Sequence, residues 1–215
     1  EGMSKFYREM ALRLMSVATA LTVLVLGARQ LPREFSSRTL YPLLARPIHR
    51  NSFLLGKLLG VAGAGCFCLL LFLGLYIMGC VGIGVPIYAG LLIQHLWLQM
   101  CMVLLLSSVS MLLSLLFSMD GALTIGVLLF TLSAAVSNLF LMLYEQTGRA
   151  GQWFLQVFTW VLPQLPLFSI AEKNVHGEIW GPLPLSVIGQ LTLYALLLSL
   201  IYMALTSWLF RRRSL

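Results

Sequence analysis

Charged residues are scarce in this sequence. Only 10% of its 215 residues are Asp, Glu, Lys or Arg, whereas 60% are apolar or aromatic. Soluble domains carry about 25% charged residues, because polar groups must cover the water-exposed surface. The composition therefore excludes ordinary soluble, disordered and collagen-like proteins. With a mean hydropathy of +0.93, the chain is predicted to be an all-α integral membrane protein.

Motifs for nucleotide binding and hydrolysis are also missing. The chain contains no Gly-x-x-x-x-Gly-Lys-[Ser/Thr], no His-Glu-x-x-His and no Gly-x-Ser-x-Gly. Energy for any transport must therefore come from another polypeptide, and a membrane-embedded hydrolase is disfavoured. The seven acidic residues place no pair of carboxylates inside an apolar run, which disfavours a proton-coupled carrier. We expect no catalytic residue and no cofactor in this chain.

Cysteine is rare, with four residues in the chain. All four lie inside or at the edge of apolar runs, where thiols act as small hydrophobic groups. No disulfide framework is indicated. Cys66-x-Cys68 with nearby methionines would suit copper(I), but such residues more often simply pack, so we expect no metal site.

Basic residues border the apolar runs, which indicates membrane topology and not nucleic-acid binding. Nine of the 14 lie in the loop 29–57 and the C-terminal tail, against five at the N-terminus and in the segment 144–184. Because positive charge favours the cytoplasmic side, the loop and the C-terminus are predicted to be cytoplasmic. Lys5, Arg8 and Arg13 would then lie outside. Together with the start at Glu1, this suggests that an upstream span is missing.

Long apolar runs predict the membrane spans, since a helix needs about 20 apolar residues to cross the hydrocarbon. A single transmembrane domain, 1–215, is expected, with spans at about 10–28, 58–80, 88–117, 121–143 and 185–209. Asp120 is predicted to cap the fourth span after a tight turn. Pro163 and Pro166 interrupt the apolar stretch in 150–182, which predicts a re-entrant or interfacial helical segment on the outer side. A loop lying along the headgroups is the alternative.

The predicted cytoplasmic loop is expected to contain a short amphipathic helix. Ser36 or Ser37 can cap it, Leu40, Leu43 and Leu44 share one side, and Pro47 ends it. A helix this short is not stable alone in water. It should therefore lie against either the membrane surface or a partner protein.

The same loop resembles the signature of type-2 ABC transporter permeases. Glu34, Thr39-Leu40, Leu43-Leu44, Pro47, Arg50 and Gly56-Lys57 follow the order and nearly the spacing of that signature. Arg38 stands where the family commonly has glycine. The chain end Phe210-Arg211-Arg212 is similar to the end of the family's last span.

The resemblance implies a helical bundle of six spans per subunit, five of them visible here, in a bacterial cytoplasmic membrane. It further implies a second permease subunit, identical or different, and separate cytoplasmic ATPase subunits that hold ATP and Mg. The helix around 37–46 would be the coupling helix of an ATP-driven exporter; a non-transporting membrane scaffold is the alternative. The residues expected to couple to the ATPase are Glu34, Arg38, Thr39, Leu40, Leu43, Leu44, Arg46, Pro47, Arg50 and Lys57.

Polar residues inside the apolar runs are candidates for the translocation path, because burying them in a membrane is costly. His95 and Gln99, one helical turn apart, fit either that path or hydrogen bonds between helices. Ser107, Ser110 and Ser114 form a polar stripe that fits close helix contact, a dimer interface or the path, and Asn138 has the same alternatives. Gly56 and Gly60 are spaced for close helix packing.

Overall fold

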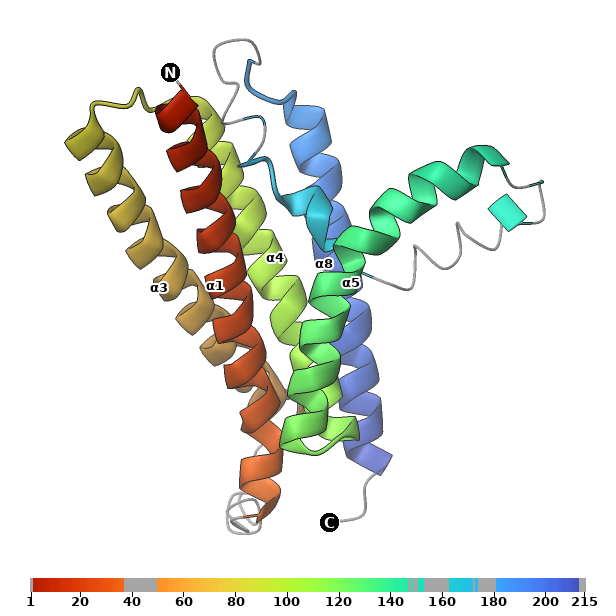
Figure 1. Cartoon of the computed structure of the whole chain (residues 1–215). Helices are drawn as coiled ribbons and strands as arrows, with labels where there is room; N and C mark the ends of the chain where they lie inside the picture. The colour runs from red at the N-terminus through yellow and green to blue at the C-terminus, as the bar shows by residue number, and fades with distance from the viewer. Residues whose placement is uncertain are drawn as a thin grey trace.

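The computed structural model describes residues 2–36, 50–146, 148, 151–152, 163–171, 173 and 181–212. Its α-helices are α1 (Gly2–Ser36), α3 (Arg50–Ile83), α4 (Ala89–Leu116), α5 (Met119–Gln146) and α8 (Leu185–Arg212), and the 3₁₀ helix η1 covers Leu165–Phe168. The described part of the chain contains no β-strand. The predicted all-α membrane bundle is confirmed (Figure 1).

Each predicted span coincides with one of these helices, and only the third, 88–117, extends one residue beyond its helix at each end. Among the residues whose side chains the structure describes, four segments are long and apolar enough to cross a membrane, namely Lys5–Pro32, Asn51–Ile83, Ala89–Leu116 and Leu185–Arg212. Within the same residues, the apolar part of α5 is Met119–Ser133. The C-terminal half of α5 turns away from the bundle (Figure 1). The exact limits of the spans within these helices stay a prediction.

The helices continue beyond the predicted spans on both sides of the loop that was predicted to be cytoplasmic. α1 runs to Ser36 and α3 already begins at Arg50, so the loop is shorter than the predicted 29–57. A hydropathy window detects only the apolar part of a helix, and backbone hydrogen bonding carries the helix further into polar sequence. The predicted coupling helix at 37–46 lies outside the described residues.

One end of the bundle collects several chain segments. Figure 1 places the end of α1, the start of α3, the turn between α4 and α5 and the end of α8 together, and we call this the loop end. The N-terminus, the turn between α3 and α4 and the start of α8 lie at the opposite end. Gly84 lies in that second turn with a φ of 74°, a conformation that favours glycine.

The turn at the loop end corrects one prediction. α5 begins at Met119, so Ser118 and not Asp120 is its N-cap. The Ser118 Oγ accepts a hydrogen bond from the Gly121 amide at 3.4 Å, and the Ser118 carbonyl accepts one from the Ala122 amide at 2.8 Å. Asp120 lies instead in the first turn, where its negative charge is favourable near the helix N-terminus.

α4 is the centre of the bundle, and α3 is at its edge. The apolar window of α4 is 83% buried and that of α3 only 17%. α4 packs against α1, α3, α5, α8 and η1. Small residues allow the close approach. A Cβ built on Gly65 of α3 would lie 2.5 Å from Val23 of α1 and 2.7 Å from Val103 of α4.

The proline-containing segment packs inside the bundle over 163–171. Leu165 and Phe168 are buried, and the Phe168 carbonyl accepts a hydrogen bond from Gln99 Nε2 at 3.4 Å. Gln99 lies ten residues into α4, which is about 15 Å along the helix. The chain returns to the opposite end at Leu183, whose amide donates to Gln94 Oε1 at 2.8 Å and whose carbonyl accepts from Gln94 Nε2 at 3.1 Å. Residues 163–171 therefore pack against α4 and α5, and a re-entrant or interfacial course for the whole segment 150–182 stays a prediction.

Candidate functional site

The predicted coupling residues are only partly visible in the structure. Arg38, Thr39, Leu40, Leu43, Leu44, Arg46 and Pro47 lie outside the described residues. Glu34 is in the last turn of α1 and Arg50 opens α3, and both are described by their backbone alone. Lys57 lies two turns into α3, with its Nζ 5.6 Å from the centre of the Phe53 ring. The structure therefore places both flanks of the segment 37–49 at the loop end.

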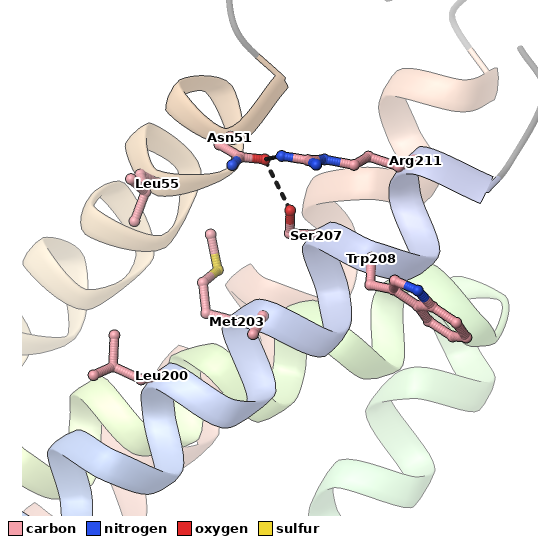
Figure 2. Close-up of a pocket in the computed structure, with 8 residues that line it drawn as sticks. Asn51, Leu55, Leu200, Met203, Ser207, Trp208 and Arg211 are labelled. Carbon is pink, nitrogen blue, oxygen red and sulfur yellow. Dashed lines mark hydrogen bonds between the residues drawn. The ribbon is translucent and has the colours of Figure 1, made fainter.

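A polar contact joins one flank of that segment to the end of α8. Asn51 is the second residue of α3, and its Oδ1 accepts hydrogen bonds from Ser207 Oγ at 2.8 Å and from Arg211 Nη2 at 3.2 Å. Figure 2 shows the three side chains meeting across the space between the two helices. This contact could not be predicted from the sequence, because its partners are up to 160 positions apart. Only the arrangement of the helices brings them together.

An apolar cluster lies behind this polar contact. It contains buried side chains from four helices: Leu31, Leu54, Leu58, Met111, Leu115, Met203 and Phe210. Phe53 stacks on Phe210 with the ring centres 6.5 Å apart. The ends of α1, α3, α4 and α8 thus form one packed unit beside the segment 37–49.

A second group of polar residues lies in the opposite half of the bundle. His95 and Gln99 of α4 are completely buried. Neither ring nitrogen of His95 has a hydrogen-bond partner, and Gln99 Oε1 has none either, among the described residues. The structure thus brings the two predicted side chains together in the core, and their role in translocation stays a prediction. Among the described residues, no group of three His, Cys, Asp or Glu side chains could hold a metal ion.

The comparison with protein families decides the identity. The profile described as "ABC-2 family transporter protein" matches residues 2–215, which is nearly the whole chain. The chain belongs to the ABC-2 transporter family. It is the membrane-embedded permease component of an ABC transporter. No curated protein and no solved structure matches it.

The serine stripe of this ABC-2 permease lies at a helix contact. Ser107, Ser110 and Ser114 are buried, and each hydroxyl donates to the backbone carbonyl three residues earlier at 2.7 to 2.9 Å. A Cβ built on Gly27 of α1 would overlap Ser110 Oγ and lie 2.6 Å from Ser110 Cβ. For Ser110 the geometry is that of close helix packing. A part in the substrate path is untested, and the Asn138 side chain lies outside the described residues.

The prediction for Gly56 and Gly60 is wrong within the described chain. A Cβ built on either residue meets nothing within 4 Å. Close approach in the permease occurs instead at Gly65 and at Gly79, where a Cβ would overlap Tyr7 Oη. Tyr7 also stacks on Tyr76, with the ring centres 6.3 Å apart. Glycine spacing marks small faces of a helix but does not show which of them meets a neighbour.

Arg8 is a buried cation that sequence analysis counted only as a flanking charge. Its side chain is 1% exposed, and its Cζ lies 5.3 Å from the centre of the Tyr88 ring. A cation over an aromatic face is attracted by the negative potential of the ring. The sequence shows only that Arg8 and Leu12 are spaced to share one helix face, and the structure buries both.

Proposed function

We propose that this permease is the transmembrane subunit of an ATP-driven exporter whose separate nucleotide-binding subunits dock on the segment 37–49. The ATPase subunits would hold ATP and Mg, since the chain lacks a phosphate-binding motif of its own. A second permease subunit, identical or different, would complete the transporter. Membership of the ABC-2 family supports this assembly.

The observation that carries the proposal is the junction at the loop end. Both helices that flank the segment 37–49 are continuous, and α1 packs along α3, α4 and α5. Asn51 ties the start of α3 to α8, and the apolar cluster around Leu54 and Phe210 joins all four helix ends. Packed interiors transmit displacement because they are poorly compressible. A movement of the docked segment would therefore pass to the helices as a rigid-body movement.

Leu40, Leu43 and Leu44 are proposed to anchor the contact, and Arg38, Arg46 and Arg50 to provide charge complementarity around it. Thr39 and Pro47 would set the two limits of the docked helix, with Glu34 and Lys57 on its flanks. The positive-charge bias supports a cytoplasmic position for this end and for the C-terminus, and we propose that the membrane is a bacterial inner membrane. Transport would proceed by alternating access without covalent chemistry in this chain.

The experiment replaces Leu43 and Leu44 together by Asp in the complex purified with its ATP-binding subunit. Burying each leucine is worth about 1.5–3 kcal/mol, so the double change should weaken subunit binding by roughly 100-fold or more. The ATPase rate and the recovery of the partner should both fall. Pull-down with a titrated partner and a coupled ATPase assay measure the two effects.

The matched control replaces Leu116 and Phe117 by Asp. Both side chains are about half exposed at the turn between α4 and α5, and this turn is also at the loop end. The control should keep both binding and ATPase rate. If the Leu43 and Leu44 variant behaves like the control, the docking assignment fails. If the complex assembles and hydrolyses ATP but moves no substrate, the chain is a scaffold.

A further inference from the structure

A groove of about 410 Å³ lies between α3 and α8 at the loop end. Figure 2 shows its apolar walls, formed by Leu55 on α3 and by Leu200 and Met203 on α8. Leu55 is 48% and Leu200 65% exposed, so both lie on a surface that would face lipid. Ala204 also lines the groove and leaves space between the larger side chains.

One end of the groove is polar and positively charged. Asn51, Ser207 and Arg211 line this end, and Trp208 lies at its rim. Arg211 gives one hydrogen bond to Asn51 through Nη2, whereas a guanidinium carries five N–H donors. Arg212 adds a second cation, with its Cζ 4.0 Å from the centre of the Trp208 ring. Among the residues that the structure describes, no acidic side chain lines the groove.

We propose that this groove binds an anionic phospholipid. The phosphate would accept hydrogen bonds from the remaining N–H donors of Arg211, since the Ser207 hydroxyl already donates to Asn51. The upper part of one acyl chain would lie along Leu55 and Leu200. The volume lies in the range of small-molecule sites, about 300–1,000 Å³, and holds the headgroup region and not the whole lipid. Basic pockets between membrane helices favour anionic headgroups, and tryptophan is typical of the headgroup level.

Charge complementarity selects the lipid over a second copy of this chain. The chain has 14 basic and 7 acidic residues. At this site the end of α8 brings Arg211 into the groove and Arg212 beside its rim, and the described lining residues include no carboxylate. A second copy would bring the same cations against them. The proposal needs only that the chain is embedded in a membrane, and it does not depend on coupling to an ATPase.

The experiment measures lipid binding to the purified full chain in detergent by native mass spectrometry. Phosphatidylglycerol and phosphatidylcholine with identical acyl chains are titrated, together with glycerol phosphate as the headgroup alone. Wild type should prefer phosphatidylglycerol, and glycerol phosphate should not displace it. Arg211→Gln should weaken phosphatidylglycerol about fivefold, since each basic residue near a membrane surface contributes about 1 kcal/mol. Arg29→Gln removes the same charge from an exposed position on α1 outside the groove, and it should leave the binding unchanged.

A second variant tests the apolar part. Ala204→Phe fills the groove and should weaken both lipids, whereas Leu205→Phe, on an exposed position beside it, should not. Equal losses for Arg211→Gln and Arg29→Gln would show only general attraction to charge and overturn the proposal. Displacement by glycerol phosphate would make it a free phosphate site. A change of oligomeric mass in Ala204→Phe without any loss of lipid would show that a second copy covers the groove.

Discussion

Gly27→Ala tests the closest contact between α1 and the central helix α4. The new Cβ would overlap Ser110 Oγ and lie 2.6 Å from Ser110 Cβ, against 3.4–4 Å in ordinary contacts. The hydroxyl can rotate, although this breaks its hydrogen bond to the Ser107 carbonyl, but the Ser110 Cβ is fixed to the backbone. α1 and α4 must therefore separate by about an ångström. Overpacking of this kind costs about 1–3 kcal/mol.

The matched control is Gly63→Ala on α3, because a Cβ at Gly63 meets nothing within 4 Å. Both changes gain the same helix propensity, about 1 kcal/mol, so their difference isolates the steric cost. Equilibrium unfolding in mixed micelles, followed by circular dichroism, should show Gly27→Ala to be about 1–3 kcal/mol less stable than Gly63→Ala. Adding Ser110→Gly should restore most of this loss. Equal stability of the two alanine variants, within about 0.5 kcal/mol, would refute the close contact.

Two further changes test the interior and the orientation. His95→Leu should raise the free energy of unfolding by about 1–3 kcal/mol, because it removes buried ring nitrogens that have no hydrogen-bond partner among the described residues. A loss of stability in chemical unfolding would instead show that His95 has a partner. A loss of transport in the stabilised variant would assign His95 to the translocation path. In a background without cysteine, a cysteine at Ile87 should react with an impermeant maleimide added to intact cells, whereas one at Ser118 should react only after the cells are opened. Both positions are exposed and lie at opposite ends of the bundle, so the reverse pattern would invert the proposed orientation.

Hydropathy was sufficient to predict the helices, because the membrane requires long apolar runs whatever the tertiary structure. It did not predict their ends. α1 continues through Pro32 to Ser36 and α3 begins at Arg50, since helix limits depend on backbone hydrogen bonds as well as on polarity. Composition predicted α5 as a membrane span. Its C-terminal half leaves the bundle (Figure 1), and this depends on packing partners that the local sequence does not identify.

Some of the polar residues in the bundle could likewise be identified from the sequence, and others could not. His95 and Gln99 were found as buried candidates because polar side chains stand out in an apolar run, and the serines were recognised by their spacing. The contact of Asn51 with Ser207 and Arg211 could not be found in this way, since each residue alone is an ordinary polar group at a helix end. Likewise Gly56 and Gly65 look alike in the sequence, and only the neighbouring Val23 and Val103 distinguish the packed glycine from the open one.

The contact at Gly65 also determines how α3 can move. Gly65 lies near the middle of α3 and is held against α1 and α4, whereas most of the helix has few protein neighbours. Gly65 is therefore the point about which α3 could tilt. Because Asn51 and the apolar cluster hold the loop end of α3 to α8, an outward tilt of this end would carry the end of α8 with it. The same tilt would press Gly79 toward the Tyr7 ring, which already lies against it. Under the proposed coupling, a push at Arg50 would thus displace the two ends of α3 in opposite directions.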